Sequence, residues 1–158
     1  MKDCLIKTAD KITPLLLRLT LGAVSFPHGA QKVFGWFGGH GYSATMKMFT
    51  ENMHIPAPAA FLAILAEFGG AIALLFGLLT RAAAAGIASV MVVAILTVQY
   101  RNGFFMNWSG AQAGEGFEYH LLALAIAVAL IIEGGGKWSV DRALSRVDQP
   151  ENPNTIGA

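Results

Sequence analysis

Four stretches of this sequence are long and apolar enough to form membrane-spanning helices. They cover residues 12–34, 58–80, 82–100 and 118–135. A spanning helix needs about 20 mostly apolar residues, because the hydrocarbon core is roughly 30 Å thick and each helical residue rises about 1.5 Å. The chain is 54% hydrophobic and only 13% charged, whereas a soluble domain carries charge on roughly a quarter of its positions. The sequence therefore predicts an all-α fold, a membrane-embedded antiparallel four-helix bundle.

The basic residues are divided unequally between the two ends of this predicted bundle. Only a few residues around Arg81 connect the second and third stretches, so these helices must be antiparallel neighbours. One end carries Lys2, Lys7, Lys11, Arg81, Lys137, Arg142 and Arg146, and the other carries Lys32, Lys47 and Arg101. Because cytoplasmic flanks are enriched in Lys and Arg, we expect both termini in the cytoplasm. The predicted location is the bacterial plasma membrane, as a multi-pass protein.

The segments outside the apolar stretches have their own patterns. In residues 42–53, the spacing of Met46, Met48, Phe49 and Met53 predicts a short interfacial helix with an apolar side. Residues 102–117 mix aromatic residues with glycines, which predicts a loop that folds back onto the outer mouth of the bundle. The predicted domain covers residues 1–148, and we expect residues 149–158 to form a disordered tail.

Small residues recur at every fourth position of the second stretch, at Gly69, Ala73 and Gly77. Such a row lets two helix backbones approach closely, within one chain or between two copies in a homo-oligomer. The general richness of membrane helices in Gly and Ala explains the row nearly as well.

Glu67 is the polar residue that the bilayer should reject most strongly. It lies about ten residues into the second stretch and therefore near the bilayer centre. A charge at that depth costs at least a few kcal/mol, so we expect Glu67 to point inward, toward a partner or a cavity. One structural interpretation is an ion pair between Arg18 and Glu67, and another is a protonated Glu67 bonded to a polar neighbour. Arg18 could instead extend to the headgroups.

Antiparallel threading gathers further polar side chains in the outer half of the bundle. The candidate ligand pocket consists of Arg18, His28, Gln31, Lys32, Glu67, Gln99, Asn102, Glu118 and His120. Such a set suits a proton relay or a hydrogen-bonding pocket for a lipophilic headgroup such as a quinone. A hydrogen-bonded lattice that only orients the helices explains it equally well. We expect no metal site, because no pair has the ExxH spacing of di-iron bundles.

Two further features limit the chemistry of the chain. Cys4 is the only cysteine, which excludes an internal disulfide and a CxxC redox pair. The sequence contains no ligand motif for haem or an iron–sulfur cluster and no dinucleotide fingerprint, so electrons would need a bound quinone or a partner protein. The formal net charge of +1 offers no basic field for nucleic acid.

Short motifs spread in order over nearly the whole chain resemble those of the DoxX family. They are residues 28–39 (HGAQKVFGWFGG), 67–70 (EFGG), 77–81 (GLLTR), 102–105 (NGFF), 116–119 (GFEY) and 138–141 (WSVD). The resemblance implies a four-helix membrane protein linked to quinol oxidase and thiosulfate:quinone oxidoreductase chemistry and to redox stress complexes. It places Arg18, His28, Gln31, Lys32, Glu67, Asn102 and Glu118 at the family's polar positions without giving any of them a catalytic role. His120 stands where many relatives look apolar.

The leading hypothesis is a DoxX-type protein that acts as a subunit or accessory of quinone-linked membrane redox chemistry. Its expected partners are the lipid bilayer, other membrane redox subunits and a second copy of itself, and a quinone is the one cofactor considered. Whether the chain is itself an enzyme stays open. The first alternative is a small proton-coupled transporter or lipophile-binding module with Glu67 as a protonatable switch. The second is a purely structural membrane subunit.

Overall fold

Four long helices dominate the computed structural model, which describes residues 5–147. They are α2 (Thr13–Phe34), α4 (Ala57–Phe76), α5 (Thr80–Thr97) and α6 (Glu118–Glu133), and each coincides with one of the predicted apolar stretches. All regular secondary structure in the described range is helical, which confirms the predicted all-α class. The predicted disordered tail at residues 149–158 lies outside the described residues.

Shorter helices connect and follow the four long ones. They are η1 (Trp36–Gly38), α3 (Gly41–Lys47), η2 (Met48–Asn52), η3 (Gln99–Asn102) and α7 (Val140–Val147). Helix α3 continues directly into the π-helical turn η2, so the predicted helix in residues 42–53 is confirmed.

The turn between α4 and α5 shows why the second helix ends four residues before its predicted end. Gly77 adopts a left-handed conformation with φ of 66°, which glycine tolerates without steric cost. The Leu78 amide then donates to the Ala73 carbonyl at 2.9 Å, and this bond satisfies a carbonyl at the end of α4. The chain reverses within residues 77–79, which makes α4 and α5 antiparallel neighbours as predicted.

The closest helix contact lies between α2 and α4, and it depends on glycines of α2. A Cβ added to Gly29 would lie 2.6 Å from the Phe68 Cα, and one added to Gly22 would lie 3.0 Å from the Ala71 carbonyl oxygen. In contrast, a Cβ at Gly69 would meet only the Leu65 side chain of its own helix. Within this row, Gly69 therefore makes no close contact with another helix, whereas a Cβ added to Gly77 would lie 2.9 Å from the Ser139 Cα.

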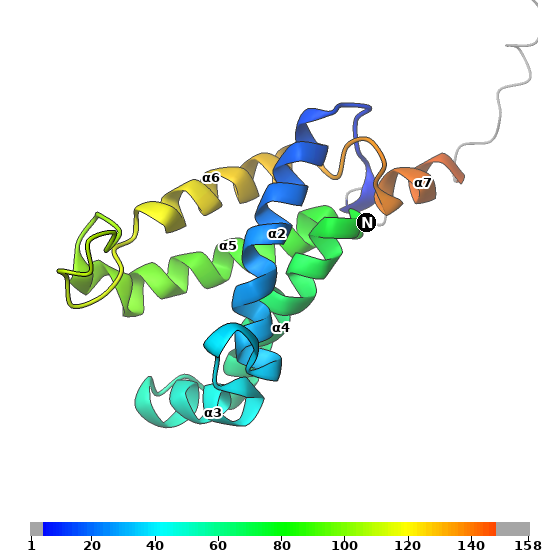
Figure 1. Ribbon diagram of the computed structural model, residues 1–158. Coiled ribbons are helices and arrows are strands. Elements are labelled where there is room, and N and C mark those ends of the chain that lie inside the picture. The colour runs from blue at the N-terminus through cyan, green and yellow to red at the C-terminus, as the bar shows by residue number, and fades with distance from the viewer. Residues whose placement is uncertain (1–4, 148–158) are drawn as a thin grey trace, which may run out of the picture.

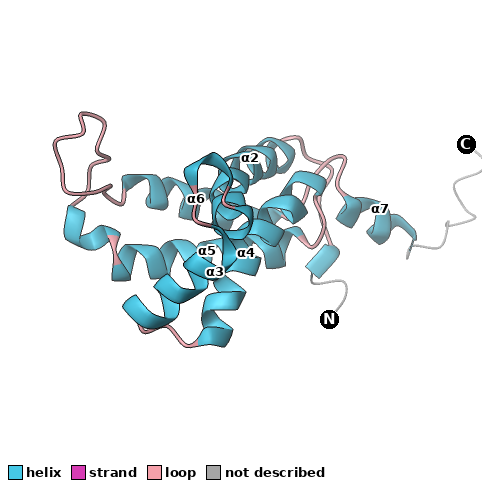
Figure 2. Ribbon diagram, turned by 60° about the horizontal axis from the view of Figure 1, so that its bottom comes forward, coloured by secondary structure: helices cyan, strands magenta, loops and turns pink. Residues whose placement is uncertain are grey.

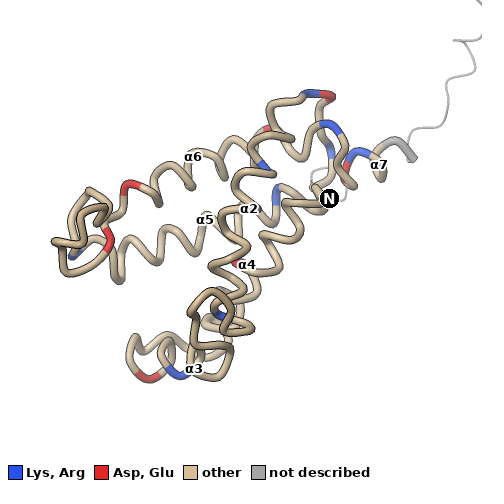
Figure 3. The backbone as a smooth tube through the Cα atoms, in the orientation of Figure 1, with Lys and Arg blue, Asp and Glu red and all other residues tan. Residues whose placement is uncertain are grey.

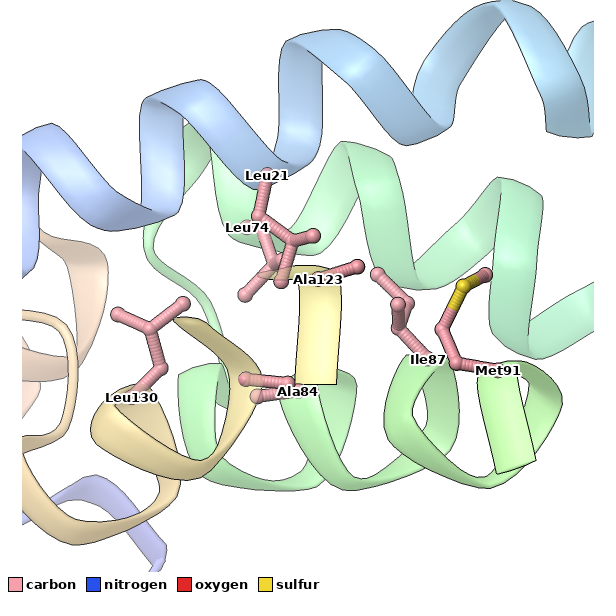
Figure 4. Packing of buried hydrophobic residues seen from close by; sticks show 8 residues of the cluster. Leu21, Leu74, Ala84, Ile87, Met91, Ala123 and Leu130 are labelled. Carbon is pink, nitrogen blue, oxygen red and sulfur yellow. The ribbon is translucent and has the colours of Figure 1, made fainter. Parts of the chain in front are cut away.

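The helices form two pairs that separate from each other at one end. Figure 1 shows α2 and α4 running together, and α5 and α6 running together in a different direction. The pairs meet near α7 and the N-terminal segment, at what we call the closed end, and they diverge toward the open end. The hydrophobic core joins all four helices (Figure 4); it consists of Leu21, Leu74, Ala84, Ile87, Met91, Ala123, Ala127 and Leu130.

The outer surface of the long helices is strongly apolar. Each helix exposes a leucine: Leu16 is 59% exposed, Leu62 60%, Leu96 73% and Leu122 67%. Lys, Arg, Asp and Glu gather mainly near helix ends and in the connecting segments (Figure 3). Two helices, α4 and α5, are long and apolar enough by themselves to cross a membrane. A surface of this kind suits lipid better than water.

Candidate functional site

Arg18 lies at the closed end and is only 2% exposed. Its guanidinium donates to the carbonyl oxygens of Leu74 at 3.0 Å and Leu75 at 2.6 Å, at the C-terminal end of α4. It also donates to the carbonyls of Gly135 at 3.0 Å and Trp138 at 2.9 Å. The predicted ion pair between Arg18 and Glu67 is wrong, because the negative end of the α4 dipole and these carbonyls satisfy the cation instead.

Asp141 is a second buried charge at the closed end, with 1% exposure. Its carboxylate accepts hydrogen bonds from the backbone amides of Leu79 at 2.7 Å and Thr80 at 2.8 Å. These amides begin α5 and have no partner inside the helix, so Asp141 caps α5 from a distant part of the chain. Sequence analysis identified Asp141 only as part of a motif, because a cap supplied from 61 residues away leaves no local pattern.

A groove of about 860 Å³ lies between the helix pairs toward the open end. Helices α2, α4 and α5 line it, together with the start of α6 and the turn η2. Most lining side chains are apolar, such as Leu62, Ala66, Val90 and Met48. A mostly apolar concavity with a few polar groups is the usual form of a site for a small lipophilic ligand.

An ion pair lies on the α2 and α4 side of this groove. The Lys32 Nζ is 2.7 Å from the Glu67 Oε2, and it also approaches the His28 carbonyl oxygen at 3.5 Å. Glu67 is 4% exposed, so the prediction that it points inward is confirmed. Glu67 is also close enough to Tyr119 and His120 of α6 to interact with them electrostatically.

Several polar atoms in the groove are buried and have no hydrogen-bond partner among residues 5–147. They are the Ser25 Oγ, the Gln99 Oε1, the Tyr119 hydroxyl and the His120 Nδ1. The His28 ring lies across from Tyr119, with 6.2 Å between the ring centroids. Buried polar atoms are normally paired, and such exceptions mark places where a ligand or water supplies the bond.

The structure divides the nine candidate pocket residues into two groups. Five of them line the groove: His28, Lys32, Glu67, Gln99 and His120. The other four are Arg18, Gln31, Asn102 and Glu118. Their side chains form hydrogen bonds with backbone groups instead.

Three of these four organise the segments at the open end. The Gln31 side chain donates to the Phe37 carbonyl at 3.1 Å and so holds η1. The Asn102 amide donates to the Glu115 carbonyl at 3.0 Å, within the loop before α6. The Glu118 Oε1 accepts from the Met106 amide at 2.9 Å in the same loop. In each case the polar side chain is hydrogen-bonded to the backbone.

Two groove residues, Ser25 and Tyr119, were not among the candidates. A serine in a membrane helix usually bonds to a carbonyl of its own preceding turn, and an aromatic residue near a helix end usually marks the interface. The signal for Ser25 was its position one turn before His28 on the same side of α2.

The two segments at the open end both contribute to the groove: Met106 and Glu115 of the loop before α6 line it, as do Met48 and Phe49 of η2. Figures 1 and 2 show the loop before α6 at the tip of the α5 and α6 pair, and α3 at the tip of the other pair. The loop before α6 therefore reaches the groove at Met106 and Glu115, in agreement with the prediction of a loop that folds back onto the outer mouth. Among residues 5–147, no three His, Cys, Asp or Glu side chains gather in a way that could hold a metal ion.

The lipid-suited surface and the buried ion pair beside an apolar groove define a helical membrane protein. The chain belongs to the DoxX family, whose profile matches residues 13–100. It is 32% identical to "Inner membrane protein YqjF" of Escherichia coli over 71% of this chain and 81% of that protein. It is 31% identical to "Putative oxidoreductase CatD" of Bacillus subtilis over 76% of this chain and 79% of that protein. No solved structure matches the chain significantly.

Proposed function

We propose that the protein crosses the bacterial plasma membrane with α2, α4, α5 and α6 and has both termini in the cytoplasm. Exposed leucines on all four helices support four lipid-facing spans. The described basic residues at the closed end outnumber those at the open end, which supports a cytoplasmic closed end. They are Lys7, Lys11, Arg81, Lys137 and Arg142. With 16 residues, α6 is about 24 Å long, so it would need flanking residues to complete its span.

The protein would act as a subunit or accessory of quinone-linked redox chemistry, with a quinone bound in the groove. The observation that carries this proposal is the set of unpartnered buried polar atoms within apolar walls. The Tyr119 hydroxyl can donate to a quinone carbonyl, His120 offers a ring nitrogen, and the apolar walls can take an isoprenoid tail. When bound, a quinone supplies reversible transfer of electrons and protons. The printed name of the Bacillus subtilis relative agrees with a redox role.

Native purification tests this proposal. We expect a quinone to co-purify from bacterial membranes in mild detergent, detected by mass spectrometry of the extracted lipids, with any redox partner protein identified in the same sample. Tyr119→Phe removes only the unpartnered hydroxyl, and it should reduce the bound quinone several-fold. Tyr42→Phe is the matched control, because Tyr42 is 42% exposed and lies outside the groove. Equal quinone content in both variants, or none in the wild type, would refute the proposed site.

A further inference from the structure

The ion pair in the groove is asymmetric in a way that suggests a role in binding. The Glu67 side chain is 5% exposed, whereas the Lys32 side chain is 25% exposed. Lys32 stands in the last turn of α2 and reaches Glu67 through its flexible stem. The buried carboxylate is therefore fixed in α4, and the cation is the partner that can move.

Few other groups could compensate Glu67 if Lys32 moved away. The titratable residues that line the groove with it are His28 of α2, Tyr119 and His120 of α6, and Glu115 in the preceding loop. The lining residues of α5 carry no charge, and neither do those of η2. Among the described residues that line the groove, Lys32 is the only Lys or Arg.

We propose that ligand binding in the groove is coupled to the uptake of one proton by Glu67. A carbonyl oxygen of the ligand takes over the Lys32 ammonium, which stays protonated and leaves the carboxylate. A buried carboxylate without a cation is unfavourable, so Glu67 takes a proton from water. No covalent bond of the ligand changes, and the complex carries one more positive charge than the separate partners. This inference rests on the proposed function, and it gives Glu67 a part in regulating that site.

Titration calorimetry in nanodiscs tests the coupling, with decylubiquinone as the probe. Measurements in buffers of different ionisation enthalpy give the number of protons taken up on binding. For the wild type we expect close to one proton taken up per ligand and binding that weakens as the pH rises. Glu67→Gln should bind without proton uptake and without this pH dependence. Lys32→Met should also bind without uptake, because Glu67 would already be protonated.

The control is the exposed pair of Lys47 and Glu51, whose side chains are 71% and 61% exposed. Lys47→Met and Glu51→Gln should leave the proton count at its wild-type value. Proton uptake that persists in Glu67→Gln would assign the proton to another group, such as His28 or His120, and overturn the inference. Binding without uptake in the wild type would overturn the inference and leave the proposed function standing. Absence of binding in every variant would overturn both.

Discussion

The buried charges Arg18 and Asp141 at the closed end are paired with the backbone, whereas four polar atoms in the groove have no partner among the described residues. At the closed end the Thr80 Oγ1 and the Arg81 Nε are also unpartnered. At the closed end, Arg18 donates to carbonyls from α4 and from the segment before α7, and Asp141 accepts the first amides of α5. In the groove toward the open end, Ser25, Tyr119 and His120 each keep a buried polar atom without a partner. The apolar core lies beside the closed end, where all four helices meet.

This difference separates stability from function along the length of the helices. Hydrogen bonds from a buried charge to several carbonyls fix three chain segments in one arrangement, so the closed end stabilises the fold. Polar atoms left unpaired cost free energy in the absence of a ligand, and proteins keep such groups mainly where function requires them. The comparison predicts a large loss of stability when the buried cation of the closed end is removed and a small one when an unpaired polar atom of the groove is removed.

Arg18→Met should give the largest effect. The substitution keeps much of the apolar stem but removes the donor that Arg18 supplies to the carbonyls of Leu75 and Gly135. We expect a loss of about 3–5 kcal/mol in the free energy of unfolding, measured by denaturant titration in mixed micelles. Lys47→Met, at an exposed position, serves as the control. A loss below about 1 kcal/mol would break the distinction between the two ends.

Gly29→Ala should be the next most damaging change, because it acts on the contact between α2 and α4. The added Cβ would lie 2.6 Å from the Phe68 Cα, and backbone atoms cannot yield as a flexible side chain can. We expect a loss of about 1–3 kcal/mol in the same unfolding assay. The matched control is Gly69→Ala, whose Cβ would meet only the Leu65 side chain at 3.4 Å. Equal losses at the two glycines would contradict the observed contact.

Asp141→Asn should cost less, because the amide keeps one oxygen that can accept a hydrogen bond. The new side-chain nitrogen cannot accept a hydrogen bond. The backbone amide of either Leu79 or Thr80 would therefore lose its acceptor. We expect a loss of about 1–2 kcal/mol, with fraying of the first turn of α5 visible as faster amide hydrogen exchange. Asp10→Asn is the control, because Asp10 is exposed and its carboxylate pairs with Arg142 instead of with α5. Unchanged exchange in α5 would exclude the capping role.

The sequence predicted the helices well, because lipid solvation imposes a simple rule on length and polarity. It also predicted that Glu67 points inward, since a carboxylate at that depth needs a partner. It failed where partners come from distant segments. Arg18 binds carbonyls that a residue pattern cannot display, and Lys32 pairs with Glu67 although the two are 35 positions apart. The close approach of α2 and α4 also depends on packing contacts, such as Gly29 on Phe68, that periodicity does not encode.

Ser25→Ala should have the smallest effect on stability and the most informative effect on binding. The Ser25 hydroxyl is buried and has no partner, whereas the Ser89 hydroxyl, also in the groove, donates to the Ala85 carbonyl at 2.9 Å. Removing an unpaired buried hydroxyl costs no hydrogen bond within the protein, so the free energy of unfolding should change by less than about 0.5 kcal/mol or rise. If the groove binds a headgroup, Ser25→Ala should nevertheless weaken the binding of decylubiquinone several-fold, whereas Ser89→Ala should not. Loss of stability without any change in binding would mean that Ser25 only supports helix packing, and the contrast between the two ends would then disappear at this position.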